Sequence, residues 1–196
     1  KEDNFAWWVR RVEVASKLFD TIRIDHFRGF EAYFAIPASD TDALRGKWKK
    51  GPNVALFNAI KKELGEIDII AENLGFLTEG VHKMLNRLGY PGMKILEFGF
   101  DPKGDSEHMP HRLTCNDVVY TGTHDNMPIF QYIFDLDPAK LAVFLKDLHK
   151  EADLLNMEVH DKTYKEIVGS VIELAFASKA NMCIIPMQDL LCQDGS

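Results

Sequence analysis

The sequence predicts an α/β fold built of βαβ units, whose strands form a parallel sheet. Short apolar runs alternate with longer segments of helical periodicity, which is the pattern that such units produce. Three of the short runs end in an acidic residue, at the position where (β/α) barrels carry their functional groups. No internal repeat, low-complexity run or linker interrupts the 196 residues. The pattern therefore indicates a single domain or a part of one.

The first part of the chain predicts two helices and one strand. Residues 5–18 are expected to be helical because Trp8, Val12 and Ala15 recur near helical spacing. Residues 20–25 (DTIRID) form a short β-rich run. The next segment repeats Val54, Phe57, Ile60 and Leu64 at helical spacing, and Gly65 is expected to end that helix.

The middle of the chain predicts three further strands and a helix between them. Residues 68–71 (DIIA) read as the second strand of the sheet. Thr78 is expected to cap a helix that runs through Val81, Leu85 and Leu88 and stops at Gly89. The third and fourth strands are expected at residues 94–98 and residues 117–121 (DVVYT).

The last part of the chain is expected to be mostly helical after Pro128. Asp137 followed by Pro138 is a cap with a first-turn proline. Thr163 and Glu166 have the spacing of a capping box ahead of another apolar stripe. Residues 182–185 (MCII) are expected to form the fifth strand, which Pro186 ends.

Five such strands suit either a small open sheet or the later strands of a (β/α)8 TIM barrel. The chain begins Lys-Glu-Asp-Asn, with neither an initiator methionine nor a signal peptide, and stops soon after an apolar stretch. These ends favour a piece of a longer protein. We therefore expect residues 1–196 to be part of one TIM-barrel catalytic domain, with the upstream strands missing.

Composition and charge limit the class of partner. Apolar residues make up 46% of the chain, which suffices for a core, and the net charge is −7. An acidic chain argues against nucleic acid and against anionic membranes, because both attract basic surfaces. No apolar run approaches the roughly 20 residues of a membrane span. A neutral ligand such as a polysaccharide needs no long-range electrostatic attraction.

The three cysteines indicate a reducing compartment. Cys115, Cys183 and Cys192 are odd in number and form no C-x-x-C pair. We expect them to be reduced and buried, with Cys115 in the core, and we expect the protein to be cytoplasmic.

Three carboxylates at strand ends are the candidate catalytic residues. Asp25 ends the first strand, Glu72 follows the second, and Asp125 lies in the segment after the fourth. Taken singly, each could be a solvated or helix-capping side chain. Three in succession, each with a polar or basic neighbour, favour a shared site at the mouth of a barrel.

The neighbours of the first two carboxylates suggest different protonation states. Arg23 lies two residues before Asp25, so both side chains face one side of the strand and the guanidinium keeps Asp25 ionised. Glu72 follows apolar residues only, and partial burial favours its protonated form. One charged and one protonated carboxyl group is what cleavage of a glycosidic bond requires. Asp125 and its neighbour His124 are suited to binding a sugar hydroxyl.

Cofactor and metal chemistry find little support in the sequence. The seven histidines form neither H-x-x-x-H nor H-E-x-x-H, so we expect no metal site. Neither G-x-G-x-x-G nor a phosphate-loop pattern is present, so we expect no nucleotide cofactor.

Four motifs, in order along nearly the whole chain, resemble the 4-α-glucanotransferase family (amylomaltases or disproportionating enzymes, glycoside hydrolase family 77). They are residues 23–30 (RIDHFRGF), 70–75 (IAENLG), 120–126 (YTGTHDN) and 186–191 (PMQDLL). Residues 48–52 (WKKGP), 98–101 (FGFD) and 109–111 (MPH) support the resemblance. The family usually has Asp at the position of Asn73, and often has Asp-Thr where Met127-Pro128 stand here.

The resemblance implies a role for each matched residue. Asp25 matches the nucleophile, Glu72 the general acid/base and Asp125 the transition-state stabiliser. Arg23 and His124 match residues that orient the nucleophile and the sugar. Phe98 and Asp101 match a loop that contacts the acceptor glucan. The implied substrates are α-1,4-glucans such as maltooligosaccharides, starch or glycogen, without any cofactor.

Two other functions remain open at this stage. Members of the family are much longer than this chain, so the chain alone could be an inactive or sugar-binding part of the barrel. Open sheet edges would then favour self-association. An α-amylase-type hydrolase is the other alternative.

Overall fold

A computed structural model describes residues 3–100 and 106–193 of the chain. Its internal contacts divide the chain into two compact units, Lys1–Gly92 and Met93–Ser196, and each is described separately below. The expectation that residues 1–196 belong to one catalytic domain stays a prediction.

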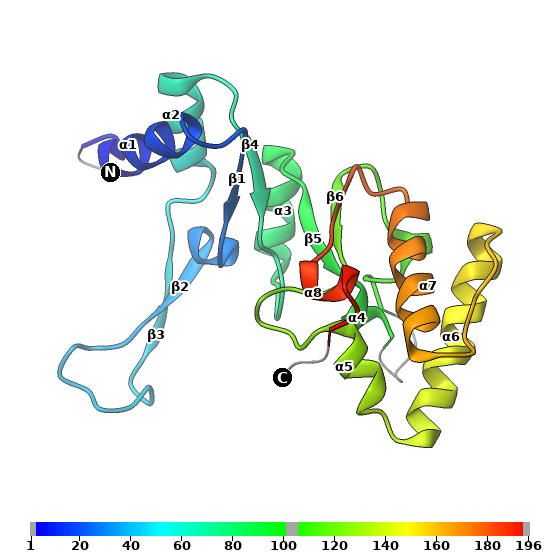
Figure 1. The fold of residues 1–196 in the computed structure, drawn as a ribbon. Coiled ribbons are helices and arrows are strands. Elements are labelled where there is room, and N and C mark those ends of the chain that lie inside the picture. The colour runs from blue at the N-terminus through cyan, green and yellow to red at the C-terminus, as the bar shows by residue number, and fades with distance from the viewer. Residues whose placement is uncertain (1–2, 101–105, 194–196) are drawn as a thin grey trace. The chain divides into compact units, whose positions relative to one another are not determined.

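Unit 1 is built around the parallel strands β1 and β4, which lie side by side (Figure 1). Strand β1 pairs with β4 from Thr21↔Asp68 to Ile24↔Ala71, and Ala71 also pairs with Gly92, the last residue of the unit. Its elements are α1 (Ala6–Ser16), β1 (Thr21–Ile24), the 3₁₀ helix η1 (Phe27–Phe30), β2 (Ala32–Ala35), β3 (Lys47–Lys50), α2 (Val54–Leu64), β4 (Asp68–Ala71) and α3 (Glu79–Leu88).

The core of unit 1 lies between these helices and the sheet. Phe27 and Phe57 stack there with ring centroids 5.0 Å apart, and apolar residues of α2, α3 and β4 surround them. Gly65 and Gly89 end α2 and α3 with φ of 80° and 70°, as the sequence predicts. Thr78 is the N-cap residue of α3, although its side chain makes no capping hydrogen bond.

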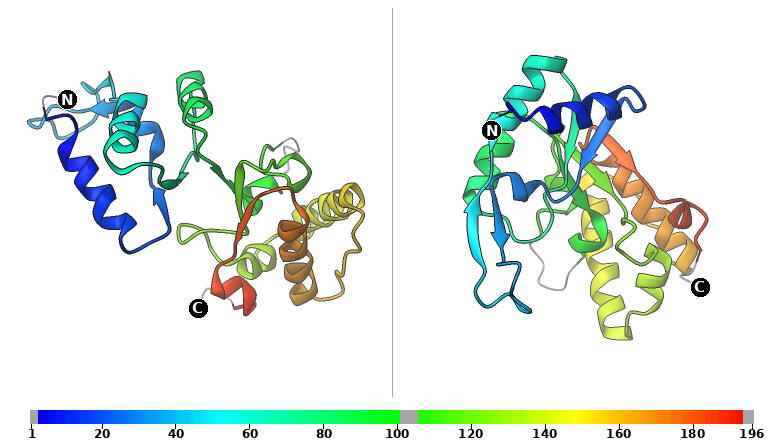
Figure 2. Two further views of the ribbon diagram at one scale, coloured as in Figure 1. Left: turned by 90° about the horizontal axis from the view of Figure 1, so that it is seen from above. Right: turned by 90° about the vertical axis from the view of Figure 1, so that its left-hand side faces the viewer.

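The sequence reading missed an antiparallel hairpin, β2–β3, which extends from unit 1 (Figures 1 and 2). Its second strand, KWKK, is exposed at every position, so it lacks the apolar alternation that marks a half-buried strand. Trp48 anchors it by packing on Phe34 of β2 and under the guanidinium of Arg28, 4.4 Å from the ring centroid.

Gly51 allows the end of the hairpin to approach η1. A Cβ atom there would lie 2.2 Å from the Phe30 carbonyl oxygen, whereas a Cβ on Gly169 in helix α7 (Tyr164–Ala177) of unit 2 meets nothing within 4 Å. We expect Gly51→Ala to lower the free energy of unfolding by about 1–3 kcal/mol. Gly169→Ala, the matched control, should raise it by about 0.5–1 kcal/mol through helix propensity. Urea denaturation measures both, and equal effects would contradict the prediction.

Unit 2 has parallel strands in the order β5–β6–β7. Strand β6 pairs with β7 from Val118↔Met182 to Tyr120↔Ile184. Its elements are β5 (Gly92–Ile95), α4 (Leu96–Gly99), the 3₁₀ helix η2 (Pro110–Arg112), β6 (Asp117–Tyr120), α5 (Ile129–Phe134), α6 (Pro138–Leu155), α7 (Tyr164–Ala177), β7 (Met182–Ile184) and α8 (Met187–Leu190). Both units therefore have the α/β organisation that the sequence predicts.

The long helices of unit 2 begin where capping signals predict. Asp137 accepts the backbone N–H of Lys140 at 2.9 Å, and Thr163 accepts that of Glu166 at 3.2 Å. Helices α6 and α7 pack their apolar faces into a core that includes Phe144, buried to 1% exposure.

Two predictions for unit 2 were wrong. The third strand ends at Ile95 rather than at residue 98, because residues 96–99 turn into α4. Cys115 is exposed rather than in the core, since it lies in the turn that leads into β6. Cys183 and Cys192 are partly buried, and all three are free thiols.

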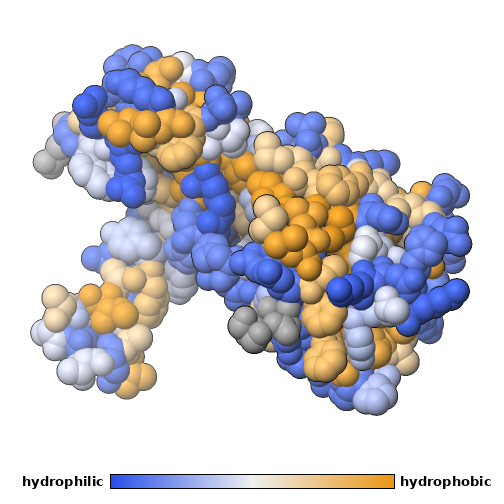
Figure 3. Space-filling model, in the orientation of Figure 1, coloured by the Kyte–Doolittle hydropathy of each residue, from blue (hydrophilic) through white to orange (hydrophobic). Residues whose placement is uncertain are grey.

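Apolar side chains are exposed around the last strand of unit 2, where Figure 3 shows them over β7 and α8. They are Met182, Ile184, Met187, Leu190 and Leu191. Strand β7 pairs only with β6 among the described strands, so its other edge is free to pair. None of the helices within residues 3–100 and 106–193 has the length and apolarity needed to cross a membrane.

Candidate active site

Asp25 and Glu72 occupy neighbouring strand ends in unit 1. They directly follow the paired residues Ile24 and Ala71, and the Glu72 N–H extends the ladder by donating to the Ile24 carbonyl at 2.9 Å. Adjacent strands lie about 4.8 Å apart, so the two carboxyl-bearing residues start from adjacent positions. The pairing of β1 with β4 therefore brings together two residues that are distant in the sequence.

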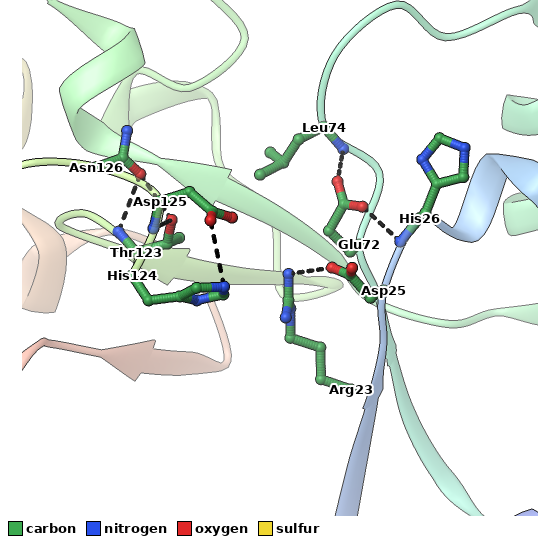
Figure 4. A network of polar contacts seen from close by, with 9 residues as sticks. All are labelled: Arg23, Asp25, His26, Glu72, Leu74, Thr123, His124, Asp125 and Asn126. Carbon is green, nitrogen blue, oxygen red and sulfur yellow. Dashed lines mark hydrogen bonds and ion pairs between the residues drawn. The ribbon is translucent and has the colours of Figure 1, made fainter. Parts of the chain in front are cut away.

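Arg23 holds Asp25 in place, as the sequence predicts. Its Nη2 lies 2.8 Å from Asp25 Oδ1, and both side chains extend from the same side of β1 (Figure 4). The Asp25 side chain is 75% exposed, so it is open to a ligand. The guanidinium contacts one of the two carboxylate oxygens and orients the side chain.

Glu72 is oriented by backbone donors that the sequence reading did not foresee. Its Oε2 accepts the N–H of His26 at 2.7 Å, and its Oε1 accepts that of Leu74 at 2.6 Å (Figure 4). The side chain is partly buried, as expected. Each carboxyl oxygen has two lone pairs, so each keeps one for a substrate or a proton.

The backbone at His26 makes this arrangement possible. His26 has φ 48° and ψ 50°, a left-handed conformation that is uncommon outside glycine. Because of this turn, the N–H of the next residue, Phe27, continues the pairing between the two strands and donates to the Glu72 carbonyl at 3.0 Å. It thereby leaves the His26 N–H free for the Glu72 side chain.

His124 and Asp125 lie on an ordered turn after β6 in unit 2. Asn126 Oδ1 accepts both the N–H and the hydroxyl of Thr123, at 3.1 and 2.7 Å, and Thr123 Oγ1 accepts the Asp125 N–H at 3.2 Å. These bonds leave the His124 and Asp125 side chains exposed, with Nε2 and Oδ1 3.4 Å apart (Figure 4). The residues T-H-D-N thus build their own turn.

Two further acids of unit 2 escaped the sequence reading. Asp189 is 1% exposed; its Oδ1 accepts the Ile129 N–H at 2.8 Å and its Oδ2 the Thr121 hydroxyl at 2.5 Å. Glu97 follows β5, and burial, then the charge of Asp189, raises its pKa to about 7. An acid within an apolar run, as in ILEFGF and PMQDLL, is the signal that could have found both.

Glu97 makes stability depend on pH. Its pKa rises on folding from the ordinary 4.5 to about 7, so the folded chain loses stability as pH rises through this range. The full shift is worth about 3 kcal/mol, and solvent screening of the half-buried group reduces it to about 1–2 kcal/mol. Glu97→Gln should therefore be more stable than the parent chain by this amount at high pH, and little different at low pH. Urea denaturation in a pH series measures it, and a gap independent of pH would contradict it.

The remaining predicted residues are placed only in part. Phe98 lies in α4, 41% exposed, with its ring edge-on to His108 at 5.7 Å between centroids. Asp101 lies outside the described residues. Among the described residues, no group of three or more His, Cys, Asp or Glu side chains is arranged to hold a metal ion.

Parallel strands with an aspartate and a glutamate at adjacent carboxyl ends are the arrangement of (β/α) barrels that act on glycosidic bonds. The model of the 4-alpha-glucanotransferase family matches residues 1–196. The chain therefore belongs to the 4-alpha-glucanotransferase family, glycoside hydrolase family 77.

Individual relatives agree with this membership. The chain is 42% identical to a 4-alpha-glucanotransferase of Streptococcus pneumoniae, over 97% of this chain and 36% of the relative. It is 43% identical to a chloroplastic/amyloplastic 4-alpha-glucanotransferase of Solanum tuberosum, over 97% of this chain and 31% of the relative. The chain thus spans about a third of the length of these relatives.

Solved structures show the same fold. The Streptococcus agalactiae amylomaltase, solved in complex with acarbose, superposes with a TM-score of 0.84 at 36% identity, covering 99% of this chain and 37% of that one. A Corynebacterium glutamicum amylomaltase, at 20% identity, shares the fold with a TM-score of 0.67. The chain is therefore α/β and corresponds to part of a TIM barrel, as the sequence predicts.

Proposed function

We propose that the protein containing this chain is a 4-alpha-glucanotransferase that transfers a segment of an α-1,4-glucan to an acceptor glucan or glucose with retention of configuration. The observation that carries the proposal is the placement of Asp25 and Glu72 directly after the paired residues Ile24 and Ala71. Retaining enzymes need carboxyl groups about 5–5.5 Å apart, which adjacent strand ends can provide.

In the first step, an Asp25 oxygen attacks the anomeric carbon of the donor glucan. The glycosidic carbon–oxygen bond breaks, and the proton of Glu72 moves to the departing oxygen. The glucosyl unit is then held as an ester of Asp25. Arg23, whose Nη2 contacts Asp25 Oδ1, orients the nucleophile.

In the second step, Glu72 takes the proton from the 4-hydroxyl of an acceptor glucan. The acceptor oxygen bonds to the anomeric carbon, and the bond to Asp25 breaks. Glu72 must change between acid and base, and its two backbone donors hold the carboxyl group in one place through both steps.

The residues of unit 2 have supporting roles in this proposal. Asp125 stabilises the positive charge that develops on the sugar ring, and His124 binds a sugar hydroxyl. Their side chains are exposed on the turn after β6, as binding requires. Phe98 and Asp101 contact the acceptor glucan.

The proposal extends to substrate and location. Maltooligosaccharides, starch and glycogen are the proposed substrates, with roles in starch, glycogen or maltose metabolism. We propose that the protein is cytoplasmic. We also propose that the reaction needs no metal or organic cofactor, because a carboxylate nucleophile and proton transfer suffice.

Maltotriose tests the proposed activity. A glucanotransferase converts it to glucose together with maltooligosaccharides longer than three units, which chromatography of the products resolves. Trapping the glycosyl ester on the peptide that contains Asp25 tests the retaining mechanism. Glu72→Gln is mixed with an α-glycosyl fluoride donor, whose leaving group needs no proton, and is quenched rapidly for mass spectrometry. An ester on another residue would contradict the assignment.

The products also separate the alternatives. Glucose and maltose without longer sugars would instead favour an α-amylase-type hydrolase. Binding of maltotriose without any new product would favour a sugar-binding part of a barrel. The free edge of β7 makes self-association of the isolated chain a further proposal, which light scattering after gel filtration tests.

A further inference from the structure

His108 of unit 2 has no role in the proposed mechanism, although it contacts the helix that carries Phe98. Its Nδ1 atom accepts the backbone N–H of Ile95 at 3.1 Å, and its ring lies edge-on to the ring of Phe98 with centroids 5.7 Å apart. Ile95 is the last residue of β5 and the N-cap residue of α4. One side chain thus contacts both the start of α4 and the aromatic ring on it.

The hydrogen bond to Ile95 requires a neutral imidazole that carries its proton on Nε2. Nδ1 accepts a hydrogen bond only when it has a lone pair, which an imidazolium lacks. Burial, and then the charge of Lys94, lowers the pKa of His108, so the neutral ring is favoured. Ile95 is fully buried, so the loss of this acceptor would leave its N–H unpaired away from water. The bond therefore attaches residue 108 to the start of α4.

The segment that carries His108 is fixed by its own contacts. The His108 N–H donates to Ser106 Oγ at 3.1 Å, and the Met109 N–H donates to the Ser106 carbonyl at 3.3 Å. Met109 is buried in the core of unit 2. Glu107, which precedes His108, forms an ion pair with Lys94 of β5. The imidazole therefore extends from a turn that is anchored on both sides of it.

Helix α4 packs closely against this turn, but the Phe98 side chain itself is partly exposed. A Cβ atom on Gly99 would lie 3.0 Å from Met109 Sδ and 3.3 Å from the His108 carbonyl oxygen. Leu96, at the other end of α4, is fully buried. Among residues 3–100 and 106–193, His108 carries the one ring that contacts Phe98. The backbone of α4 is thus fixed by packing, whereas the Phe98 ring has His108 as its aromatic neighbour.

We propose that His108 is a positioning residue for Phe98, whose ring it orients by an edge-on contact while its Nδ1 holds the start of α4. The two ring planes are 79° apart, and such a contact favours one relative orientation of the rings. A Phe98 ring that is already oriented loses less conformational entropy when a sugar packs on it. The role in acceptor binding rests on the proposed function, in which Phe98 contacts the acceptor glucan, whereas the contact between the rings does not.

NMR of the 196-residue chain tests the geometry without any activity. The ring-nitrogen shifts of His108 should show an unprotonated Nδ1 and a protonated Nε2 at neutral pH, and nuclear Overhauser effects should connect the His108 and Phe98 rings. In His108→Ala, the Ile95 amide should exchange with solvent at least about tenfold faster, because its acceptor is lost. In His108→Asn, whose Oδ1 can replace Nδ1 as the acceptor, the exchange rate should be closer to that of the parent.

Acceptor kinetics test the role in transfer. With an α-maltosyl fluoride donor the leaving group is fluoride, so the KM for labelled maltose reports binding of the acceptor separately from that of a leaving sugar. His108→Ala and Phe98→Ala should each raise this KM about tenfold, with kcat changed much less. The double variant should raise it no further, because His108 acts through Phe98. His149→Ala, which changes an exposed histidine of α6, is the control and should alter neither quantity.

Three results would overturn the proposal: a His108 proton on Nδ1, no Overhauser effect between the two rings, or KM increases that add in the double variant. Additive increases would show that His108 acts independently of Phe98. Should His108→Ala fail to fold, His108→Asn, which keeps the acceptor but lacks the ring, replaces it in the kinetic cycle. If neither the chain nor the protein that contains it transfers from the fluoride, the proposed function fails and the NMR results alone decide this proposal.

Discussion

Replacing Asp25 by Asn should lower the rate of transfer from maltotriose by at least about 10⁴-fold, as expected when the proposed covalent nucleophile is removed. The amide keeps the shape of the carboxyl group but lacks the negative charge that attacks the anomeric carbon. Because the Asp25 side chain is 75% exposed and its pair with Arg23 is at the surface, the free energy of unfolding should change by less than about 1 kcal/mol. Initial rates and urea denaturation on the same preparation measure both quantities.

Asp20→Asn is the matched control for this loss. Asp20 is also an exposed aspartate, but it precedes β1 rather than following it, so it lies at the opposite end of the strand. Its variant should transfer at the parent rate. Added azide should restore turnover to Asp25→Ala by forming a glucosyl azide, because the small anion can replace the missing nucleophile. A transfer rate for Asp25→Asn within tenfold of the parent would contradict the assignment.

The sequence sufficed for elements whose local signals agree with the fold. The run at residues 68–71 is a strand with the predicted bounds, because an apolar run is followed by polar residues. Helix α7 begins at its capping box, since the Thr163 hydroxyl accepts the backbone N–H of Glu166 within the first turn. Strand β3 was missed because Trp48 packs on residues distant in sequence, Phe34 and Arg28, which leave no local pattern.

The same distinction applies to the candidate site. The pair of Arg23 and Asp25 could be predicted because alternation along a strand places residues two apart on one side. The His26 donor to Glu72 could not be predicted, because it depends on a left-handed backbone conformation at another strand end. The charge of Asp189 on Glu97 was likewise invisible, since 92 positions separate them in the chain.

Replacing Phe27 by Ala should have the largest effect on stability, about 3–5 kcal/mol, because it leaves a cavity in the core of unit 1. Phe27 is fully buried, stacks on Phe57 at 5.0 Å and meets Phe30 and Tyr90 at 5.5 and 6.2 Å between ring centroids. Urea denaturation measures the loss. Phe19→Ala, with a parent ring that is 62% exposed, is the control and should cost under about 1 kcal/mol.

Phe27 also connects the core to the candidate acid, since its N–H donates to the Glu72 carbonyl beside the left-handed His26. Phe27→Leu keeps most of the buried volume and should cost about 1 kcal/mol, which leaves a folded chain for kinetics. If the ring fixes the turn that orients Glu72, this variant should lower kcat for transfer with little change in KM, whereas Phe19→Ala should alter neither. A loss of stability without any loss of kcat would show that the core supports the strand ends but does not position the acid.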